Sequence, residues 1–151
     1  MSLRELASQA KRKGGKGRHG RLLTFKEIRR IKKRGYEAER ELVRKLRING
    51  FKAVRVPVSA PSGEPLPDVF ATKGDFLLAF EVKAPRAERA YFPRGQVEKL
   101  FLFLNFFEPF TKKMAILAAK FPRRWVFKMV EKPDDYVVSR DEQSSFNPEI
   151  Q

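Results

Sequence analysis

The sequence predicts a mixed α/β domain in which helices flank a central sheet of about five strands. Apolar residues recur with helical spacing over residues 24–48 and again over residues 94–107. Short runs rich in β-branched and aromatic residues lie between and after these two helices. The predicted order is therefore helix, three strands, helix, two strands, and a chain of 151 residues fits one such domain.

The first predicted helix has signals at both ends. Thr24-Phe25-Lys26-Glu27 matches a capping box, in which the threonine and glutamate side chains each accept a hydrogen bond from a backbone N–H. Asn49-Gly50 predicts a C-terminal stop just after Ile48. Gly35 is expected to divide this helix into an outer basic segment and an inner one. The predicted apolar face consists of Ile28, Ile31, Ala38, Leu42, Leu46 and Ile48.

Five short segments are predicted to be strands. Residues 51–57 form the first, and a proline-rich irregular loop follows it. Residues 68–73 and 76–83 are predicted to pair as a hairpin, because Gly74-Asp75 between them suits a two-residue type II′ turn. The last two strands, residues 114–119 and 125–130, follow the second helix.

The charge of the chain predicts a polyanionic partner. Lysine and arginine number 33 against 18 acidic residues, which gives a net charge of +15. Residues 1–34 alone hold 13 basic and two acidic side chains. We therefore expect residues 1–31 to be a flexible, partly helical basic arm, residues 32–140 to be the folded domain and residues 141–151 to be a loose tail.

Composition also excludes several classes of protein. The absence of cysteine rules out disulfide scaffolds, thiol nucleophiles and cysteine-ligated zinc, and the single His19 cannot build a histidine metal site. No apolar stretch approaches the roughly 20 residues of a membrane span, so no membrane partner is expected. The N-terminus lacks the apolar core of a signal peptide, which favours a cytoplasmic location in a prokaryote or in the host of a virus.

The predicted hairpin brings two acidic residues together. If Gly74 and Asp75 are the turn, residues whose numbers sum to 149 face each other, and Asp68 lies opposite Glu81. Opposed side chains of like charge destabilise a sheet, so a compensating cation is expected, and a divalent metal is the simplest choice. Lys83 shares a strand face with Glu81 and could stabilise charge on a phosphate. The alternative is that Lys83 simply neutralises Glu81 on an exposed strand.

These residues belong to a longer pattern. It comprises Lys33-Arg34-Gly35, Ala38 to Val43, Gly50-Phe51, Val54-Arg55, Ser59, Leu66-Pro67-Asp68, Glu81-Val82-Lys83 and Gln96 to Leu100. The chain thereby resembles the archaeal-type Holliday junction resolvases of the PD-(D/E)xK nuclease superfamily. The resemblance implies a restriction-endonuclease-like core, with Glu39, Asp68 and Glu81 as ligands of Mg²⁺, for which Mn²⁺ is an expected substitute. It also implies Lys83 as the catalytic lysine and Ser59 as a loop serine that contributes to activity.

The function implied is cleavage of symmetric strands of a four-way DNA junction by a homodimer, in DNA recombination and repair, with no small-molecule cofactor besides the metal. Two like sites would serve the two like strands, and the second helix has more apolar surface than one sheet covers. At least one of Phe103, Phe106, Phe107 or Phe110 is therefore expected at the subunit boundary. The predicted DNA-binding residues are Arg30, Lys32, Lys33, Arg34, Arg55 and Arg94.

Two other functions stay open at this point. A related nuclease could act on flaps, mismatches or linear duplex, and a non-catalytic basic protein could bind nucleic acid without cutting it. Single residues also have plainer explanations: Glu39 and Glu41 could be ordinary exposed helix acids, Ser59 could be loop filler, and Gln96 could be a helix-start residue without a role. The basic arm before Lys32 and the segment after Phe107 depart from the family pattern.

Overall fold

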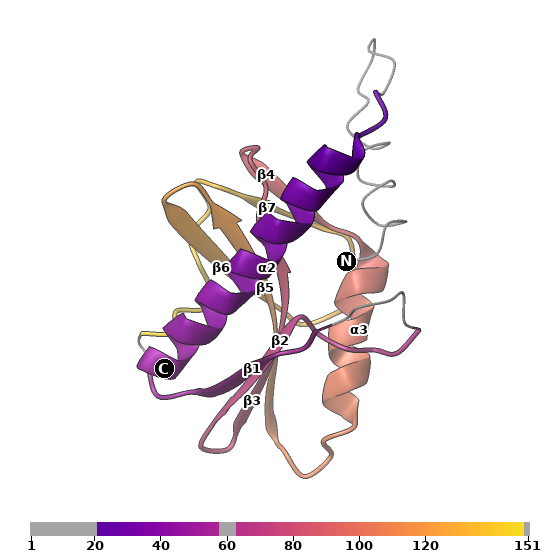
Figure 1. The fold of residues 1–151 in the computed structure, drawn as a ribbon. Helices are drawn as coiled ribbons and strands as arrows, with labels where there is room; N and C mark the ends of the chain where they lie inside the picture. The colour runs from indigo at the N-terminus through magenta and orange to yellow at the C-terminus, as the bar shows by residue number, and fades with distance from the viewer. Residues whose placement is uncertain (1–20, 58–62, 150–151) are drawn as a thin grey trace.

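The computed structural model describes residues 21–57 and 63–149 (Figure 1). Its elements are α2 (Phe25–Ile48), β1 (Lys52–Arg55), β2 (Val69–Lys73), β3 (Phe76–Lys83), β4 (Arg89–Phe92), α3 (Arg94–Asn105), β5 (Lys112–Phe121), β6 (Arg124–Val130) and β7 (Tyr136–Ser139). Five strands form one mixed sheet in the order β1-β2-β3-β5-β6. This arrangement confirms the predicted mixed sheet with two flanking helices.

Helix α2 begins and ends where the sequence predicts. The Thr24 side chain accepts a hydrogen bond from the Glu27 backbone N–H (3.2 Å), and the Glu27 side chain accepts one from the Thr24 N–H (2.7 Å). Asn49 is the C-cap, and Gly50 follows with φ +87°. The helix continues through Gly35, so the expected division there is wrong. The expected start of the folded domain at residue 32 also lies inside this helix.

The β2–β3 hairpin has the predicted register, from Val69 opposite Phe80 to Lys73 opposite Phe76. Gly74 has φ +59°, and Asp75 does not share this positive φ, as a type II′ turn requires. Strand β3 then pairs with β5 in parallel over its whole length, and Lys83 lies opposite Ala119. The carboxyl ends of β3 and β5 therefore meet at one end of the sheet.

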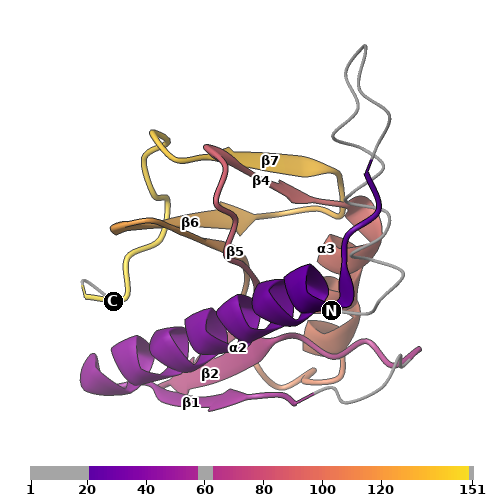
Figure 2. The same ribbon diagram turned by 45° about the horizontal axis from the view of Figure 1, so that its top comes forward.

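Two hydrophobic cores cover the two faces of the sheet. Figure 2 shows the ribbon of the sheet with α2 and α3. On β3, Leu78, Phe80 and Val82 belong to the core that also contains the buried residues of α2. Leu77 and Ala79 belong to the core that contains α3. Because side chains alternate along a strand, Glu81 and Lys83 lie on the α3 face.

The structure contains a second, two-stranded sheet that the sequence interpretation missed. Strand β4 pairs with β7 antiparallel, from Arg89 opposite Ser139 to Phe92 opposite Tyr136 (Figure 2). Ala90, Phe92 and Val138 are buried in the α3 core. This small sheet therefore extends the domain beside the carboxyl end of β3.

The segment after Arg140 is packed against the domain, contrary to the expectation of a loose tail, and both Phe146 and Pro148 are buried. Phe146 is 2% exposed, and its ring makes edge contacts with Phe51, Phe80 and Phe127 at centroid distances of 5.8–6.5 Å. Burying one aromatic side chain is worth about 1.5–3 kcal/mol, which is enough to anchor a short segment. Residues 141–149 therefore close over the α2 face of the sheet.

The β5–β6 hairpin has an unusual turn. Phe121 pairs with Arg124, so Pro122 and Arg123 are the two turn residues. Arg123 has φ +63° and is the one non-glycine residue with positive φ in the described part of the chain. A side chain at such a φ costs about 1–2 kcal/mol, and turns of this kind normally place glycine or asparagine there.

Within residues 21–57 and 63–149, no helix combines the length and the apolar character that crossing a membrane requires.

Candidate active site

A cavity of about 1100 Å³, here called the main cavity, opens between α2, the carboxyl end of β3 and the β4–β7 sheet. Three of the sequence-predicted catalytic residues line it, namely Glu39, Asp68 and Lys83. Glu39 comes from α2, Asp68 immediately precedes β2, and Lys83 ends β3. Its cationic lining consists of Arg30, Lys32, Arg34, Lys83, Arg86 and Arg89.

Asp68 is fixed by the backbone of β3. Its N–H donates to the Phe80 carbonyl (3.0 Å), which continues the ladder of the hairpin by one residue. Its carboxylate oxygen Oδ2 accepts a hydrogen bond from the Val82 N–H (2.8 Å). The side chain is therefore held against the strand that carries Glu81 and Lys83, as the predicted register requires.

Glu39 lies on the inner side of α2 and is 7% exposed, so it is not an ordinary exposed helix acid. Arg55 of β1 donates from Nε to its carboxylate across 2.5 Å. Burial and the nearby negative charge of Asp68 raise the pKa of Glu39 to about 7, and the contact with Arg55 opposes this rise. The carboxyl groups of Glu39 and Asp68 therefore lie close enough together to influence each other's charge.

Lys83 is the last residue of β3 and is 5% exposed. Its Nζ lies 5.7 Å from the centroid of the Phe92 ring, which comes from β4. A buried ammonium group beside a cavity is well placed to stabilise negative charge on a ligand, because the low local dielectric strengthens the attraction. The second small sheet thus forms one wall around the predicted catalytic lysine.

Glu81 is less closely associated with the main cavity. It is partly buried on the same strand face as Lys83, but it is not among the residues that line the cavity. Among the described residues, no three acidic or histidine side chains are close enough together to form a metal-binding cluster. The structure thus groups Glu39 with Asp68, and the role of Glu81 as a third ligand stays a prediction.

The donor chemistry of this pair fits a hard divalent cation. Carboxylate oxygens are the ligands that Mg²⁺ uses, often one or two from the protein with water and phosphate completing the shell. Glu39 and Asp68 supply such oxygens, and repulsion from the charge of Asp68 adds to the burial that raises the pKa of Glu39. A cation between them would relieve that repulsion.

The predicted DNA-binding residues fall into two groups. Arg30, Lys32 and Arg34 line the main cavity. Lys33 and Arg94 are exposed outside it. Arg55 is engaged with Glu39, and its side chain is only 20% exposed.

Arg34 is held in place by a main-chain contact. Its Nε donates to the Ala84 carbonyl (2.7 Å), and burial together with the charge of Arg86 lowers its pKa. Two guanidinium groups that face one cavity form a site that suits a phosphate. The sequence interpretation missed Arg86 and Arg89. Their position a few residues after Lys83 is the signal that could have found them.

Ser59 and Gln96 also belong to the family pattern. Ser59 lies outside the described residues, so its predicted role stays a prediction. Gln96, in the first turn of α3, is 5% exposed, and its Oε1 has no hydrogen-bond partner within the described part of the chain. It does not line the main cavity.

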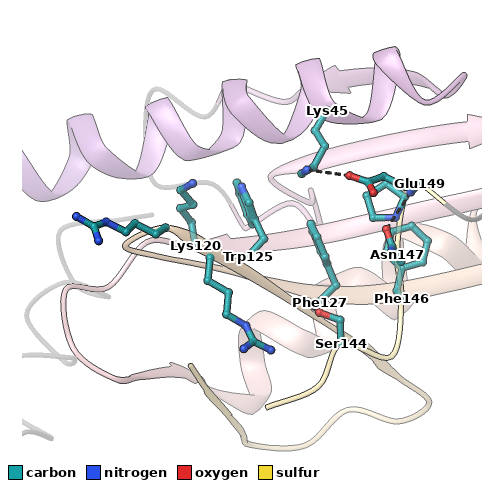
Figure 3. A pocket seen from close by; sticks show the side chains of 11 residues that line it. Lys45, Lys120, Trp125, Phe127, Ser144, Phe146, Asn147 and Glu149 are labelled. Atoms are coloured by element: carbon teal, nitrogen blue, oxygen red, sulfur yellow. Dashed lines mark hydrogen bonds and ion pairs between the residues drawn. The ribbon is translucent and has the colours of Figure 1, made fainter. Parts of the chain in front are cut away.

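A second cavity of about 360 Å³ lies on the α2 face of the sheet (Figure 3). Its walls come from the carboxyl half of α2, the β5–β6 hairpin and the C-terminal segment. Cationic and aromatic side chains dominate its lining, which includes Lys45, Lys120, Arg123, Arg124, Trp125, Phe127 and Phe146. Its distinct lining separates it from the main cavity.

Comparison with known proteins supplies independent information. A family model described as archaeal Holliday junction resolvase (Hjc) matches residues 30–147. The crossover junction endodeoxyribonuclease Hje of Saccharolobus solfataricus is 43% identical over 109 residues, which cover 71% of this chain and 79% of that protein. The Hje of Sulfolobus acidocaldarius is 46% identical over 97 residues, or 64% of this chain and 68% of that protein.

A solved structure agrees with these sequence relatives. The Holliday junction resolvase Hjc of Archaeoglobus fulgidus superposes with a TM-score of 0.59 and 31% sequence identity. The match covers 70% of this chain and 88% of that one.

Proposed function

The chain belongs to the archaeal Holliday junction resolvase family, and from this premise we propose that it is a crossover junction endodeoxyribonuclease that cuts four-way DNA junctions. The observation that carries the proposal is the meeting of Glu39, Asp68 and Lys83 at one cavity with a cationic lining. Acidic groups at a DNA-binding surface repel phosphate unless a cation intervenes. This arrangement favours a nuclease over a non-catalytic nucleic-acid binder.

The reaction proposed is hydrolysis of a phosphodiester bond with a divalent metal ion, and Mg²⁺ is the ion that the carboxylates of Glu39 and Asp68 best fit. When bound, such an ion supplies Lewis-acid activation of the phosphate and of the attacking water. Mn²⁺, which also accepts oxygen ligands, is expected to substitute. Glu81, on the same strand face as Lys83, is proposed as a further ligand.

The remaining side chains have separate proposed roles. Lys83 stabilises the negative charge that develops on the phosphate during attack, because its ammonium group is buried beside the cavity. Arg55 fixes the orientation of Glu39 through their ion pair. Arg34 and Arg86 hold phosphate groups of the strand at the same cavity. Ser59 is proposed to contribute from the loop before β2.

A homodimer is proposed because the carboxyl end of α3 presents unpartnered apolar surface. Phe106 is 74% exposed and Leu102, four residues earlier, is 48% exposed. Phe101, Phe107 and Phe110 are only partly buried against the α3 core. Two copies joined there would carry two equivalent sites, which suits the two like strands of a junction. We also propose that the protein works in the cytoplasm, in DNA recombination and repair.

Cleavage of three labelled DNAs tests the function. The full chain is incubated with a four-way junction, a flap and a linear duplex of related sequence, each with 10-fold excess of protein and either Mg²⁺ or a chelator. Paired cuts in the junction that require Mg²⁺ support the proposal. Preferred cleavage of the flap or the duplex identifies a related nuclease instead. Binding of all three DNAs without any cleavage contradicts an enzymatic function.

A further inference from the structure

The β5–β6 hairpin places cations at the edge of the second cavity. Arg123 and Arg124 lie at its turn, and both line this cavity. Lys120 of β5 and Lys45 of α2, which are labelled in Figure 3, line it as well. These four residues are here called the hairpin cluster. Lys120, Arg123 and Arg124 lie within one five-residue stretch, and the fold adds Lys45 from α2 to the lining of the same cavity.

Acidic side chains form ion pairs with only two of the four cations in the hairpin cluster. Lys120 donates to the Glu41 carboxylate (2.9 Å), and Lys45 lies 3.7 Å from Glu149. Arg124 donates to the main-chain carbonyl of Glu142 (2.8 Å), which leaves its positive charge unneutralised. No ion pair links Arg123 to an acid in the described residues. The turn therefore carries an excess of two positive charges.

The backbone at the turn argues that Arg123 serves a purpose other than folding. Its φ of +63° is one that glycine adopts without strain, yet arginine stands there. Residues kept in strained conformations are concentrated at binding and catalytic sites, where the strain is tolerated because the side chain is needed. Arg123 is also exposed, so packing does not account for it.

The hairpin lies at the same end of the sheet as the proposed active site. Lys83 pairs with Ala119, and β5 continues beyond this pair through Lys120 and Phe121 to the turn. The usual strand spacing and rise put Arg124 roughly 12 Å from Lys83 along the sheet. Each strand of a DNA duplex carries a phosphate about every 3.4 Å along its axis. A duplex held at the main cavity would thus present other phosphates near the hairpin.

We propose that the hairpin cluster is a second DNA-binding site, which takes backbone phosphates of a DNA arm whose scissile phosphate lies at the main cavity. The proposal rests on the proposed function and adds residues that lie outside the main cavity. Arg123 and Arg124 supply the phosphate contacts. Glu149, which lies beside Lys45, would have to give way to a phosphate at that lysine. The contacts are independent of base sequence, because they involve only the backbone.

Binding without cleavage provides the test, so that its result does not depend on catalysis. The affinity of the full chain for a four-way junction is measured in chelator at several salt concentrations. Each neutralised phosphate contributes about 0.9 to the slope of log affinity against log salt. The double variant R123G/R124S should lower this slope by about 2. The matched control K112S/K113S removes two charges from the opposite end of β5 and should leave the slope unchanged.

Two further variants sharpen the result. R123G alone should lower the slope by about 1 and also raise the Tm by about 2–4 °C, because glycine relieves the strained φ. E149Q should tighten junction binding, because it removes the negative charge beside Lys45. The proposal is overturned if R123G/R124S leaves the slope unchanged, or if K112S/K113S lowers it equally. It is also overturned if R123G binds the junction more weakly and has a lower Tm than the wild type. If the slopes are as expected but no variant cleaves the junction, the result counts against the proposed function and leaves the second DNA-binding site standing.

Discussion

Arg34 donates a hydrogen bond from Nε to the carbonyl of Ala84 across 2.7 Å, which joins the middle of α2 to the residue after Lys83. This contact fixes a cation of α2 at a set position relative to the proposed catalytic lysine. Removing it should therefore affect both binding and the geometry of the cut.

We predict that R34Q lowers the slope of log affinity against log salt by about 1, because it removes one phosphate contact. R34K is the matched control for charge. It should keep the slope but cut more slowly than the wild-type chain, since a lysine cannot present the planar guanidinium that holds Ala84 and a phosphate together. Equal cleavage rates for R34K and the wild type, at saturating junction, would contradict this role.

The substitutions D68N, E81Q and K83A are each predicted to reduce cleavage by at least about 100-fold while junction binding stays near normal. The first two remove proposed metal ligands, and the third removes the ammonium group that stabilises charge on the phosphate. Single-turnover cleavage and a gel-shift titration measure the two properties on the same samples. If E81Q, alone of the three variants, cleaves at the wild-type rate, Glu81 is not a metal ligand. Glu39 and Asp68 are then the two proposed ligands.

The variant E39Q is predicted to stabilise the metal-free protein above pH 7 and to abolish cleavage. The pKa of Glu39 is raised to about 7, so between its ordinary value and pH 7 the folded chain binds more protons than the unfolded chain. Stability therefore falls as the pH rises through this interval, and glutamine removes the fall. The expected gain at pH 8 is about 1–3 kcal/mol.

Thermal unfolding in chelator measures this gain. The Tm of E39Q should exceed that of the wild type by several degrees at pH 8 and should match it near pH 4, where Glu39 is protonated. Excess Mg²⁺ should reduce the difference in Tm between E39Q and the wild type at pH 8, because only the wild type has both carboxylates of the proposed metal site. An E39Q protein that melts below the wild type at pH 8 would falsify the conclusion that burial and the charge of Asp68 destabilise the ionised form of Glu39.

Phe106 is the residue at which the proposed homodimer can be tested. A phenylalanine that becomes fully buried at a subunit boundary is worth roughly 2–3 kcal/mol, so F106E should separate the subunits. I48E is a matched control, because Ile48 is 84% exposed at the far end of α2. Sedimentation velocity should give the wild type and I48E twice the 17.5 kDa of one chain, and F106E a single chain. A wild-type monomer that cuts both strands in one binding event would contradict the paired-site arrangement.

The sequence predicted the parts of the fold that depend on local signals. The capping box at Thr24 and the turn at Gly74-Asp75 each involve neighbouring residues, and both were located correctly. The hairpin turn also predicted, from register alone, that Asp68 lies beside the strand of Glu81 and Lys83. The resemblance to known resolvases added Glu39, which no local pattern distinguishes from Glu41.

What the sequence missed depends on contacts between distant segments. Strand β4 has only four residues and pairs with β7 more than 40 residues later, so its charged and aromatic residues look like part of a loop. Phe146 is followed by Asn147 and Pro148, which locally suggest an irregular tail, and only the aromatic contacts on the α2 face bury it. The distinction between Arg34 in the main cavity and Lys33 outside it also requires the position of α2 over the sheet.

Glu39, Asp68 and Lys83 belong to segments that become neighbours only when α2 has packed on the β2–β3 hairpin, whereas the positive charge of the chain needs no fold at all. Heating should therefore separate DNA cleavage from DNA binding, which the native protein is proposed to combine. A chain that has lost the packing of α2 still attracts DNA through its net charge of +15, but it no longer holds two carboxylates and an ammonium group around one phosphate. Cleavage should disappear with the first loss of tertiary structure, and DNA binding should persist, with a weaker preference for branched DNA, to higher temperature.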